Sequence, residues 1–162
     1  MNSTQMEPRY EYNDDGSLKR TSAVDQTAAE WSTYGPEKYV VEYEYDSVGR
    51  VARKVVRDTP SDDDSTRFEV DYTYDGRGQL TRERIWRYDV VSEMMLVTQD
   101  IQTSYDLGRN PTSIKFSDNY GWAYTESRVY ARGHQLINFA ISNATGVTVS
   151  DSGSYTYDDN NN

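Results

Sequence analysis

The sequence predicts an all-β protein, an antiparallel meander of consecutive β-hairpins that forms one extended, twisted or curled sheet. Three observations favour this fold class. Tyrosine is abundant, with 15 Tyr against 3 Phe and 3 Trp, and aromatic side chains suit the pleated surface of a sheet. Apolar and polar residues alternate before several turns, which is the period of a strand. A short motif, Tyr-x-Tyr-Asp/Asn-x-x-Gly, recurs along the chain and indicates a repeat architecture.

The motif has three clear copies, at residues 10–18, 43–51 and 72–80. Weaker copies begin at Tyr105 and Tyr130, and a sixth opens at residues 155–157. The second tyrosine of the motif falls at positions 12, 45, 74, 105, 130 and 157, so the period is loose. We therefore predict a single repeat domain over residues 1–162, with repeats near 8–24, 37–58, 67–89, 98–117, 124–142 and 150–162.

Each copy is expected to close a hairpin. The Asp can accept a hydrogen bond from the main-chain N–H two residues later, which starts a turn, and the Gly supplies a positive φ. A five-residue loop then sets the second tyrosine opposite the Leu or Val of the return strand. We expect pairs of Tyr12 with Leu18, Tyr45 with Val51, Tyr74 with Leu80, and Tyr130 with Leu136, each worth about 0.2–1 kcal/mol. The residues assigned to the structural repeat are Tyr12, Gly16, Leu18, Tyr43, Tyr45, Asp46, Gly49, Val51, Tyr72, Tyr74, Asp75, Gly78, Leu80, Tyr105, Asp106, Tyr130 and Leu136.

The same register makes predictions about faces and charges. It sets Glu11 against Lys19, Glu42 against Lys54, and Asp71 against Glu83; only the last pair is unfavourable. The alternation places one set of side chains on a buried face and the other on a polar face. The buried set before the second turn is Tyr39, Val41, Tyr43 and Tyr45, and the polar set is Lys38, Glu42 and Glu44.

The weaker copies depart from the motif. Gly108 and Gly133 come one place early, Ala131 replaces the Asp, and Pro111 replaces the Leu or Val. We expect altered turns at both copies. Because proline cannot donate to a strand ladder, we also expect an edge strand near Pro111.

The predicted strands follow from these turns. They span residues 8–13, 17–24, 37–46, 50–58, 67–75, 79–89, 94–105, 112–117, 121–131, 135–142 and 146–157. The longer connection at 25–36 could hold one helical turn, at 26–31. The connection at 58–66, with three aspartates at 62–64, is expected to be a solvated loop.

The pattern Tyr-x-Tyr-Asp-x-x-Gly-Arg-Val/Leu, best matched at residues 43–51 and 72–80, resembles the YD repeat of the Rhs family. That repeat also occurs in C components of insecticidal toxin complexes, in bacterial wall-associated proteins and in animal teneurins. The resemblance implies a non-enzymatic structural module of a secreted or surface bacterial protein, contributing to a β-sheet shell or scaffold. The implied partners are an enclosed toxin or further repeats of the same polypeptide, and the implied location is extracellular or on the cell surface.

The chain also departs from the family. It is too short to close a large shell alone, and it shows neither the family's self-cleavage motif nor a following toxin domain. No signal peptide is visible at its N-terminus. We therefore expect a fragment, a shell segment or a short relative. Similar repeats have been linked to carbohydrate binding, so glycan or protein recognition is the alternative function.

Composition excludes several function classes. A formal net charge of −10 disfavours binding to nucleic acid or to anionic membranes. The absence of cysteine removes disulfides and thiolate metal sites. No apolar stretch approaches the roughly 20 residues needed to span a bilayer. No phosphate-binding or dinucleotide motif is present, so no cofactor is expected.

Few residues suggest chemistry. His134 is the single histidine and lies within a predicted turn, so we interpret it as a turn residue rather than a catalytic base. Paired carboxylates could support a glycoside hydrolase, the least favoured function, but no pair stands out. The aspartates at 14–15 and 62–64 do not have the spacing of an EF-hand calcium loop. Tyr120, Trp122 and Tyr124 could bind a glycan, although we favour packing of the three on one strand face.

Overall fold

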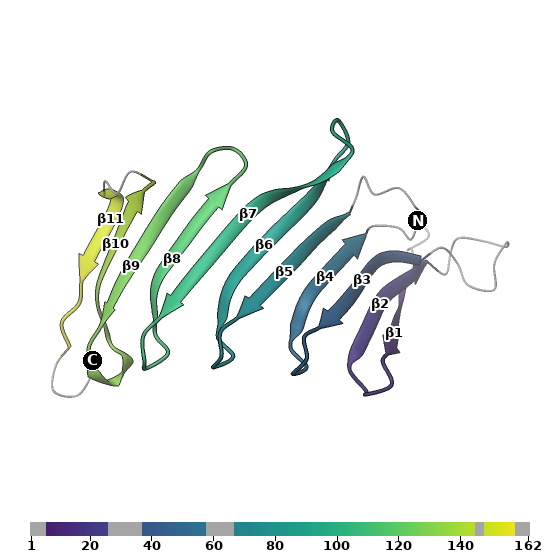
Figure 1. Cartoon of the computed structure of the whole chain (residues 1–162), viewed down its shortest axis with the longest axis horizontal. Coiled ribbons are helices and arrows are strands. Elements are labelled where there is room, and N and C mark those ends of the chain that lie inside the picture. Colours follow the sequence, from purple (N-terminus) through teal and green to yellow (C-terminus); the bar gives the residue numbers. More distant parts are fainter. Residues whose placement is uncertain (1–5, 26–36, 58–66, 145–147, 158–162) are drawn as a thin grey trace, which may run out of the picture. The chain divides into compact units, whose positions relative to one another are not determined.

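The computed structural model describes residues 6–25, 37–57, 67–144 and 148–157. Within them the predicted all-β meander is confirmed: eleven strands follow one another as neighbours in one antiparallel sheet (Figure 1). Their bounds are β1 Met6–Tyr12, β2 Leu18–Asp25, β3 Glu37–Tyr45, β4 Val51–Arg57, β5 Phe68–Tyr74, β6 Leu80–Asp89, β7 Met94–Tyr105, β8 Pro111–Asp118, β9 Ala123–Tyr130, β10 Leu136–Asn143 and β11 Thr148–Ser154. The predictions for residues 26–31 and 62–64 lie outside the described residues.

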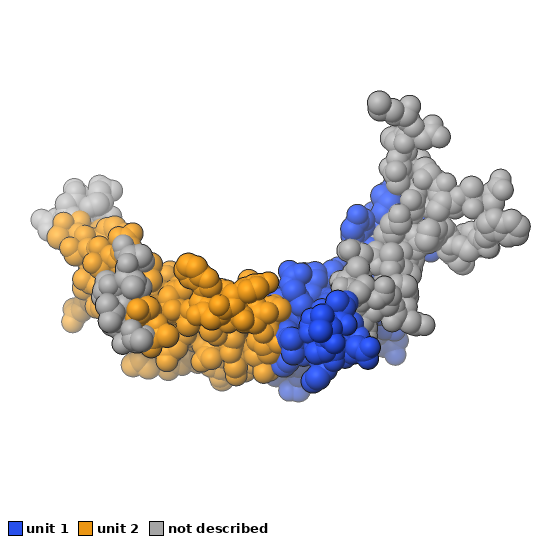
Figure 2. Space-filling model, turned by 90° about the horizontal axis from the view of Figure 1, so that it is seen from above, with its two compact units in different colours: residues 1–72, 85–96 blue, residues 73–84, 97–162 orange. Residues whose placement is uncertain are grey.

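Tertiary contacts divide the chain into two compact units (Figure 2). Unit 1 comprises Met1–Tyr72 and Ile85–Leu96, and unit 2 comprises Thr73–Arg84 and Val97–Asn162. The single repeat domain stays a prediction. The two units are described separately below.

The first four motif turns share one pattern of main-chain hydrogen bonds. At the second turn, the Asp46 N–H donates to the Arg50 carbonyl at 2.8 Å and the Gly49 N–H donates to the Asp46 carbonyl at 3.1 Å. Gly49 has φ = 84°, and the glycines of the first and third turns have nearly the same value. As predicted from a five-residue loop, the closing pairs are Tyr12–Leu18, Tyr45–Val51 and Tyr130–Leu136.

A β-bulge follows the closing pair. Tyr45 faces Val51 but Glu44 faces Arg53, so Ala52 is an extra residue. The hairpins β1–β2, β7–β8 and β9–β10 have the same shift.

Two predicted charge pairs are wrong because the bulge moves the register by one residue. Glu11 lies opposite Arg20, with which it forms a 3.0 Å ion pair, rather than opposite Lys19. Glu42 lies opposite Val55 rather than Lys54, and it forms an ion pair with Arg57. The contact of Asp71 with Glu83 stays a prediction.

The fourth turn corrects another expectation. Asp106 donates its N–H to the Asn110 carbonyl at 3.0 Å, as in the regular turns, and Arg109 takes the positive φ, 70°. The predicted alteration is therefore wrong there. Pro111 begins β8, which pairs with both β7 and β9, so the predicted edge strand is also wrong. At the first residue of a strand, the missing N–H of proline is tolerated.

The fifth turn is altered, as predicted. Residues Arg132–His134 form a short 3₁₀ turn in which Gly133 and His134 have φ values of 78° and 67°.

Fully buried side chains are few and occur on both faces of the sheet. Among the described residues, the buried apolar side chains are those of Val24, Val40, Val55 and Val70. By the alternation of side chains along a strand, Val40 and Val55 share a face with Glu42 and Arg53, so the predicted division into one buried and one polar face is wrong in unit 1. A register shift near Tyr39, whose φ is 53°, leaves this tyrosine exposed.

Candidate functional site

Tyrosine hydroxyls connect consecutive hairpins. The Tyr45 hydroxyl donates to the Leu18 carbonyl at 2.7 Å, and the equivalent bonds of Tyr105 to Leu80 and of Tyr157 to Leu136 are both 2.8 Å. In each case the donor is the second tyrosine of one hairpin copy, and the acceptor begins the return strand of the preceding copy. Each bond lies within one unit. We call these bonds tyrosine clasps; at Tyr45, Tyr105 and Tyr157 they use the polar tip of a side chain whose ring is apolar.

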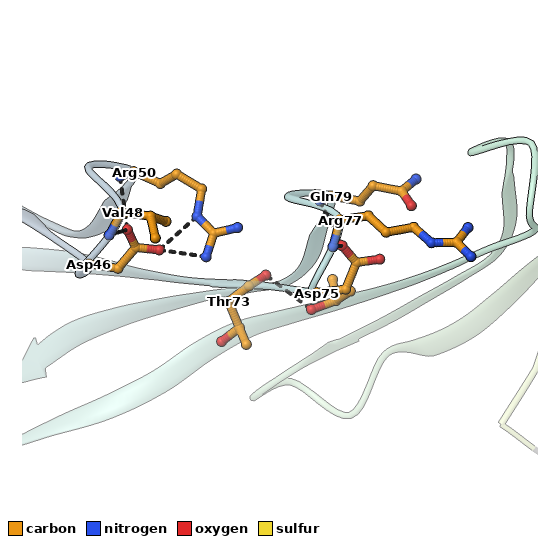
Figure 3. Close-up of polar contacts among 8 residues, drawn as sticks. Asp46, Val48, Arg50, Thr73, Asp75, Arg77 and Gln79 are labelled. Carbon is orange, nitrogen blue, oxygen red and sulfur yellow. Dashed lines mark hydrogen bonds and ion pairs between the residues drawn. The ribbon is translucent and has the colours of Figure 1, made fainter.

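The turn aspartates bind main-chain N–H groups (Figure 3). Asp46 Oδ1 accepts hydrogen bonds from the N–H groups of Val48 at 3.0 Å and Arg50 at 2.9 Å. Asp75 Oδ1 accepts them from Arg77 and Gln79, both at 2.9 Å. The bond from two residues on was predicted; the bond from four residues on was missed, because it forms only once the loop has closed.

These contacts keep the turn carboxylates ionised. The Arg50 N–H is the largest cause that lowers the pKa of Asp46, and the Gln79 N–H has the same role for Asp75. For Asp106, hydrogen bonds from the side chain and main chain of Asn110 lower the pKa. Carboxylates held in this way serve the turn and are poor candidates for a general acid.

A charged cluster in unit 1 surrounds a buried carboxylate. Glu69 is 4% exposed, and it forms ion pairs with both Arg53 and Arg67. The neighbouring Asp71 accepts a 2.7 Å hydrogen bond from Trp86 Nε1. A cleft of about 330 Å³ lies over these residues. Because Glu69 is compensated by two arginines, we interpret the cluster as structural.

Unit 2 contains a larger polar groove of about 550 Å³. Its lining residues are Asp75, Arg77, Gln79, Thr81, Gln102, Thr103, Ser104, Tyr105, Asp106 and Leu107. Two long hydrogen bonds join the third turn to the fourth: Arg77 donates to the Leu107 carbonyl at 3.4 Å, and Gln79 Nε2 donates to the Arg109 carbonyl at 3.5 Å. The side-chain oxygen of Gln79 is buried and accepts no hydrogen bond from any described residue.

The aromatic patch occupies a turn rather than a strand face. Asp118 Oδ1 accepts the N–H groups of Tyr120 at 3.0 Å and Trp122 at 2.9 Å, and Gly121 has φ = 88°. Tyr120 is 84% exposed and Trp122 is 73% exposed. Tyr124 lies on β9 and stacks on Phe116, with ring centroids 5.1 Å apart. The favoured prediction, that the three rings pack on one strand face, is therefore wrong.

The sequence carried a signal for this turn. Asp118 and Gly121 have the same Asp-x-x-Gly spacing as the hairpin turns, but no Tyr-x-Tyr pair precedes them. The Asp-x-x-Gly turn therefore occurs here without a preceding tyrosine pair.

His134 lies in the fifth turn, as predicted. Its Nδ1 is 2.6 Å from Asn110 Oδ1. Asn110 Nδ2 in turn donates to Asp106 Oδ2 at 2.9 Å, so the histidine joins the fourth and fifth turns. Within the described residues, no group of three or more His, Asp or Glu side chains could hold a metal ion. No helix in the same part of the chain has the length and apolarity to cross a membrane.

Solved structures of toxin complexes share the fold. A chain in the crystal structure of TcdB2-TccC3-Cdc42 matches 94% of this chain with a TM-score of 0.58 and 17% identity. The Photorhabdus luminescens Tc holotoxin pore, with a mutant TccC3, matches 87% with a TM-score of 0.52 and 16% identity. This chain covers only 9% and 8% of those chains. The sequence matches no protein-family model and no curated protein. At such identities the likeness shows the β-meander fold alone.

Proposed function

We propose that the chain is a non-enzymatic structural module, a segment of a β-sheet shell or scaffold of the Rhs or YD-repeat kind. The tyrosine clasp carries this proposal. Each hairpin copy can offer a carbonyl to the copy that follows and a hydroxyl to the copy that precedes it. Clasps recur from Tyr45 to Tyr157 although the spacing of the copies varies. A contact that repeats in this way serves the assembly of a sheet.

The comparisons support the scaffold at the level of the fold. This chain matches 9% of a much longer toxin-complex chain, which suits one segment of a larger sheet. Its partners would then be further repeats or an enclosed toxin, and its location extracellular or on the cell surface. Hydrolysis is the weakest alternative, because the turn carboxylates Asp46, Asp75 and Asp106 are already bound by N–H groups.

A chimera tests the scaffold proposal. Residues 6–157 would replace the segment of the TccC3-containing chain on which they superpose, and limited proteolysis would measure access to the enclosed part. We expect the chimera to protect its interior, and we expect protection to fall in a triple variant with Phe at 45, 105 and 157. A chimera that folds by circular dichroism but protects no better than a shell-deficient control would contradict the proposal.

A second candidate is recognition of a glycan or protein by Tyr120 and Trp122. The favouring observation is their exposure on a turn whose main chain is fixed by Asp118. Sugar rings stack on exposed aromatic faces. Glycan-array binding by the full chain should be lost in Trp122→Ala and kept in Leu107→Ala, which truncates an exposed apolar residue of another turn. Equal binding by both variants would remove this candidate.

A further inference from the structure

Exposed basic side chains gather on three neighbouring turns of unit 2. Two contacts hold these turns side by side: Arg77 of the third donates to the Leu107 carbonyl of the fourth at 3.4 Å, and His134 Nδ1 of the fifth lies 2.6 Å from Asn110 Oδ1. We call the exposed basic side chains of the three turns the basic rim. Its members are Arg77, Arg109, Arg132 and His134.

The rim differs from the strands of unit 2 in how its arginines are paired. On β6, the Arg82 guanidinium is bound by both carboxylate oxygens of Asp100, at 2.9 and 2.5 Å. By contrast, the guanidinium groups of Arg109 and Arg132 form no hydrogen bond or ion pair with any described residue. Their charges are therefore available to a partner.

The acidic side chains of the same turns are used internally. Asp75 and Asp106 are half-buried, and each accepts the main-chain N–H four residues on at 2.9 Å. The Arg77 guanidinium extends away from Asp75 (Figure 3), whereas in the second turn Arg50 Nε donates to Asp46 at 2.7 Å. The third to fifth turns therefore present positive charge to solvent, on a chain whose formal net charge is −10.

Two members of the rim occupy strained main-chain positions. Arg109 and His134 have φ values of 70° and 67°, at the turn position that holds glycine in the first three copies. A side chain with a Cβ is unfavourable in this conformation, and strain of this kind clusters at functional sites. The fourth and fifth turns thus keep a basic side chain where glycine would be more stable.

We propose that the basic rim binds an extended acidic protein segment whose carboxylates lie about three residues apart. Successive hairpins are two strand spacings apart, about 10 Å, and an extended chain covers that distance in about three residues. Guanidinium groups bind carboxylates through paired hydrogen bonds. Leu107, on the middle turn, is 86% exposed and offers an apolar contact, which favours a peptide over a uniformly charged polyanion. This interaction goes beyond the scaffold function.

An NMR titration of the ¹⁵N-labelled full chain tests the rim. The probe is the end-blocked peptide Glu-Ser-Leu-Glu-Ser-Leu-Glu, and one control peptide carries glutamine in place of each glutamate. A second control has the same composition with its glutamates adjacent. The spaced peptide should shift the N–H groups of Leu107, Arg109 and Arg132, and its Kd should rise with added salt. The glutamine peptide should not bind, and the peptide with adjacent glutamates should bind more weakly.

Three substitutions distinguish binding at the rim from an effect of net charge. Arg109→Gly removes one cation and relieves the strain at φ = 70°, so weaker binding by this variant does not reflect unfolding. Combined with Arg132→Gln, it should raise Kd about fivefold, through the loss of two exposed ion pairs. Lys115→Gln removes the same charge from an exposed residue of β8 in the same unit and should leave Kd unchanged.

Four results would overturn the proposal. The first is the absence of shifts at the rim up to the solubility of the peptide, and the second is equal binding by the glutamine peptide. The third is an equal rise in Kd for Lys115→Gln, which would assign binding to net charge alone. The fourth is tighter binding by single-stranded DNA or a sulfated oligosaccharide of the same charge, because the rim would then recognise polyanions in general. None of these results affects the outcome of the chimera experiment.

Discussion

Removal of a single hydroxyl tests whether a tyrosine clasp stabilises the folded sheet. Tyr45→Phe keeps the aromatic ring and deletes the hydroxyl that donates to Leu18 at 2.7 Å. Both residues are half-buried, so water can replace only part of the lost contact. A neutral hydrogen bond of this kind contributes about 0.5–1.5 kcal/mol net, and we expect the free energy of unfolding to fall by about 1 kcal/mol. That change alters the ratio of folded to unfolded chain by about fivefold.

Urea denaturation followed by far-UV circular dichroism measures the effect. For an m-value of about 1–3 kcal/mol/M, the midpoint should fall by roughly 0.3–1 M at constant m. Tyr12→Phe is the matched control, because Tyr12 is 62% exposed and its hydroxyl makes no hydrogen bond to any described residue. Its effect should stay within about 0.5 kcal/mol. Equal midpoints for the two variants would refute the clasp as a stabilising contact.

Three further predictions concern the turns and the charged cluster. Arg109→Gly removes the backbone strain of a non-glycine residue at φ = 70° and should raise the free energy of unfolding by about 1 kcal/mol. Gly78→Ala introduces such strain at φ = 81° and should lower the free energy of unfolding by a similar amount in the same urea assay. The folded state lowers the pKa values of Asp46, Asp75 and Asp106, so their ionised carboxylates stabilise the fold above the unfolded-state pKa of about 3.9. The urea midpoint should therefore be constant above that pH and decline as the pH falls through the lower folded-state pKa values. Asp75→Asn should make this decline smaller. Glu69→Leu removes the buried carboxylate that pairs with Arg53 and Arg67 and should lower the free energy of unfolding by about 2–3 kcal/mol, measured by urea denaturation. Glu11→Leu, at a more exposed pair with Arg20, should lower it by about 1 kcal/mol or less.

Strands and turns could be predicted because their signals are local. The predicted and observed bounds differ most for the last strand, which was predicted at 146–157 and is observed at Thr148–Ser154. For the strand Met94–Tyr105 the predicted and observed bounds agree at both ends. The bulge at Ala52 could not be predicted, because it depends on how the main chains of two strands pair. For this reason the predicted pairs of Glu11 with Lys19 and of Glu42 with Lys54 are wrong.

The contacts between hairpins were beyond sequence reasoning for a different reason. A tyrosine clasp ends on a main-chain carbonyl, which every residue has, so Leu18 is not marked as an acceptor for Tyr45. The groove joins Gln79 to Ser104 and Asp106, which are brought together by strand pairing rather than by a motif. The turn at Asp118, by contrast, carries a local signal in the sequence, the Asp-x-x-Gly spacing.

The order of the strands has a consequence for how the chain folds. Each strand pairs with the strands next to it in sequence, and the β1–β2 hairpin closes through residues only a few positions apart. Such contacts have a low sequence separation, so the entropy lost on closing each loop is small and folding should be fast for an all-β protein. During synthesis, an N-terminal hairpin can form before the C-terminal ones leave the ribosome, and it then offers a template edge for each strand that emerges.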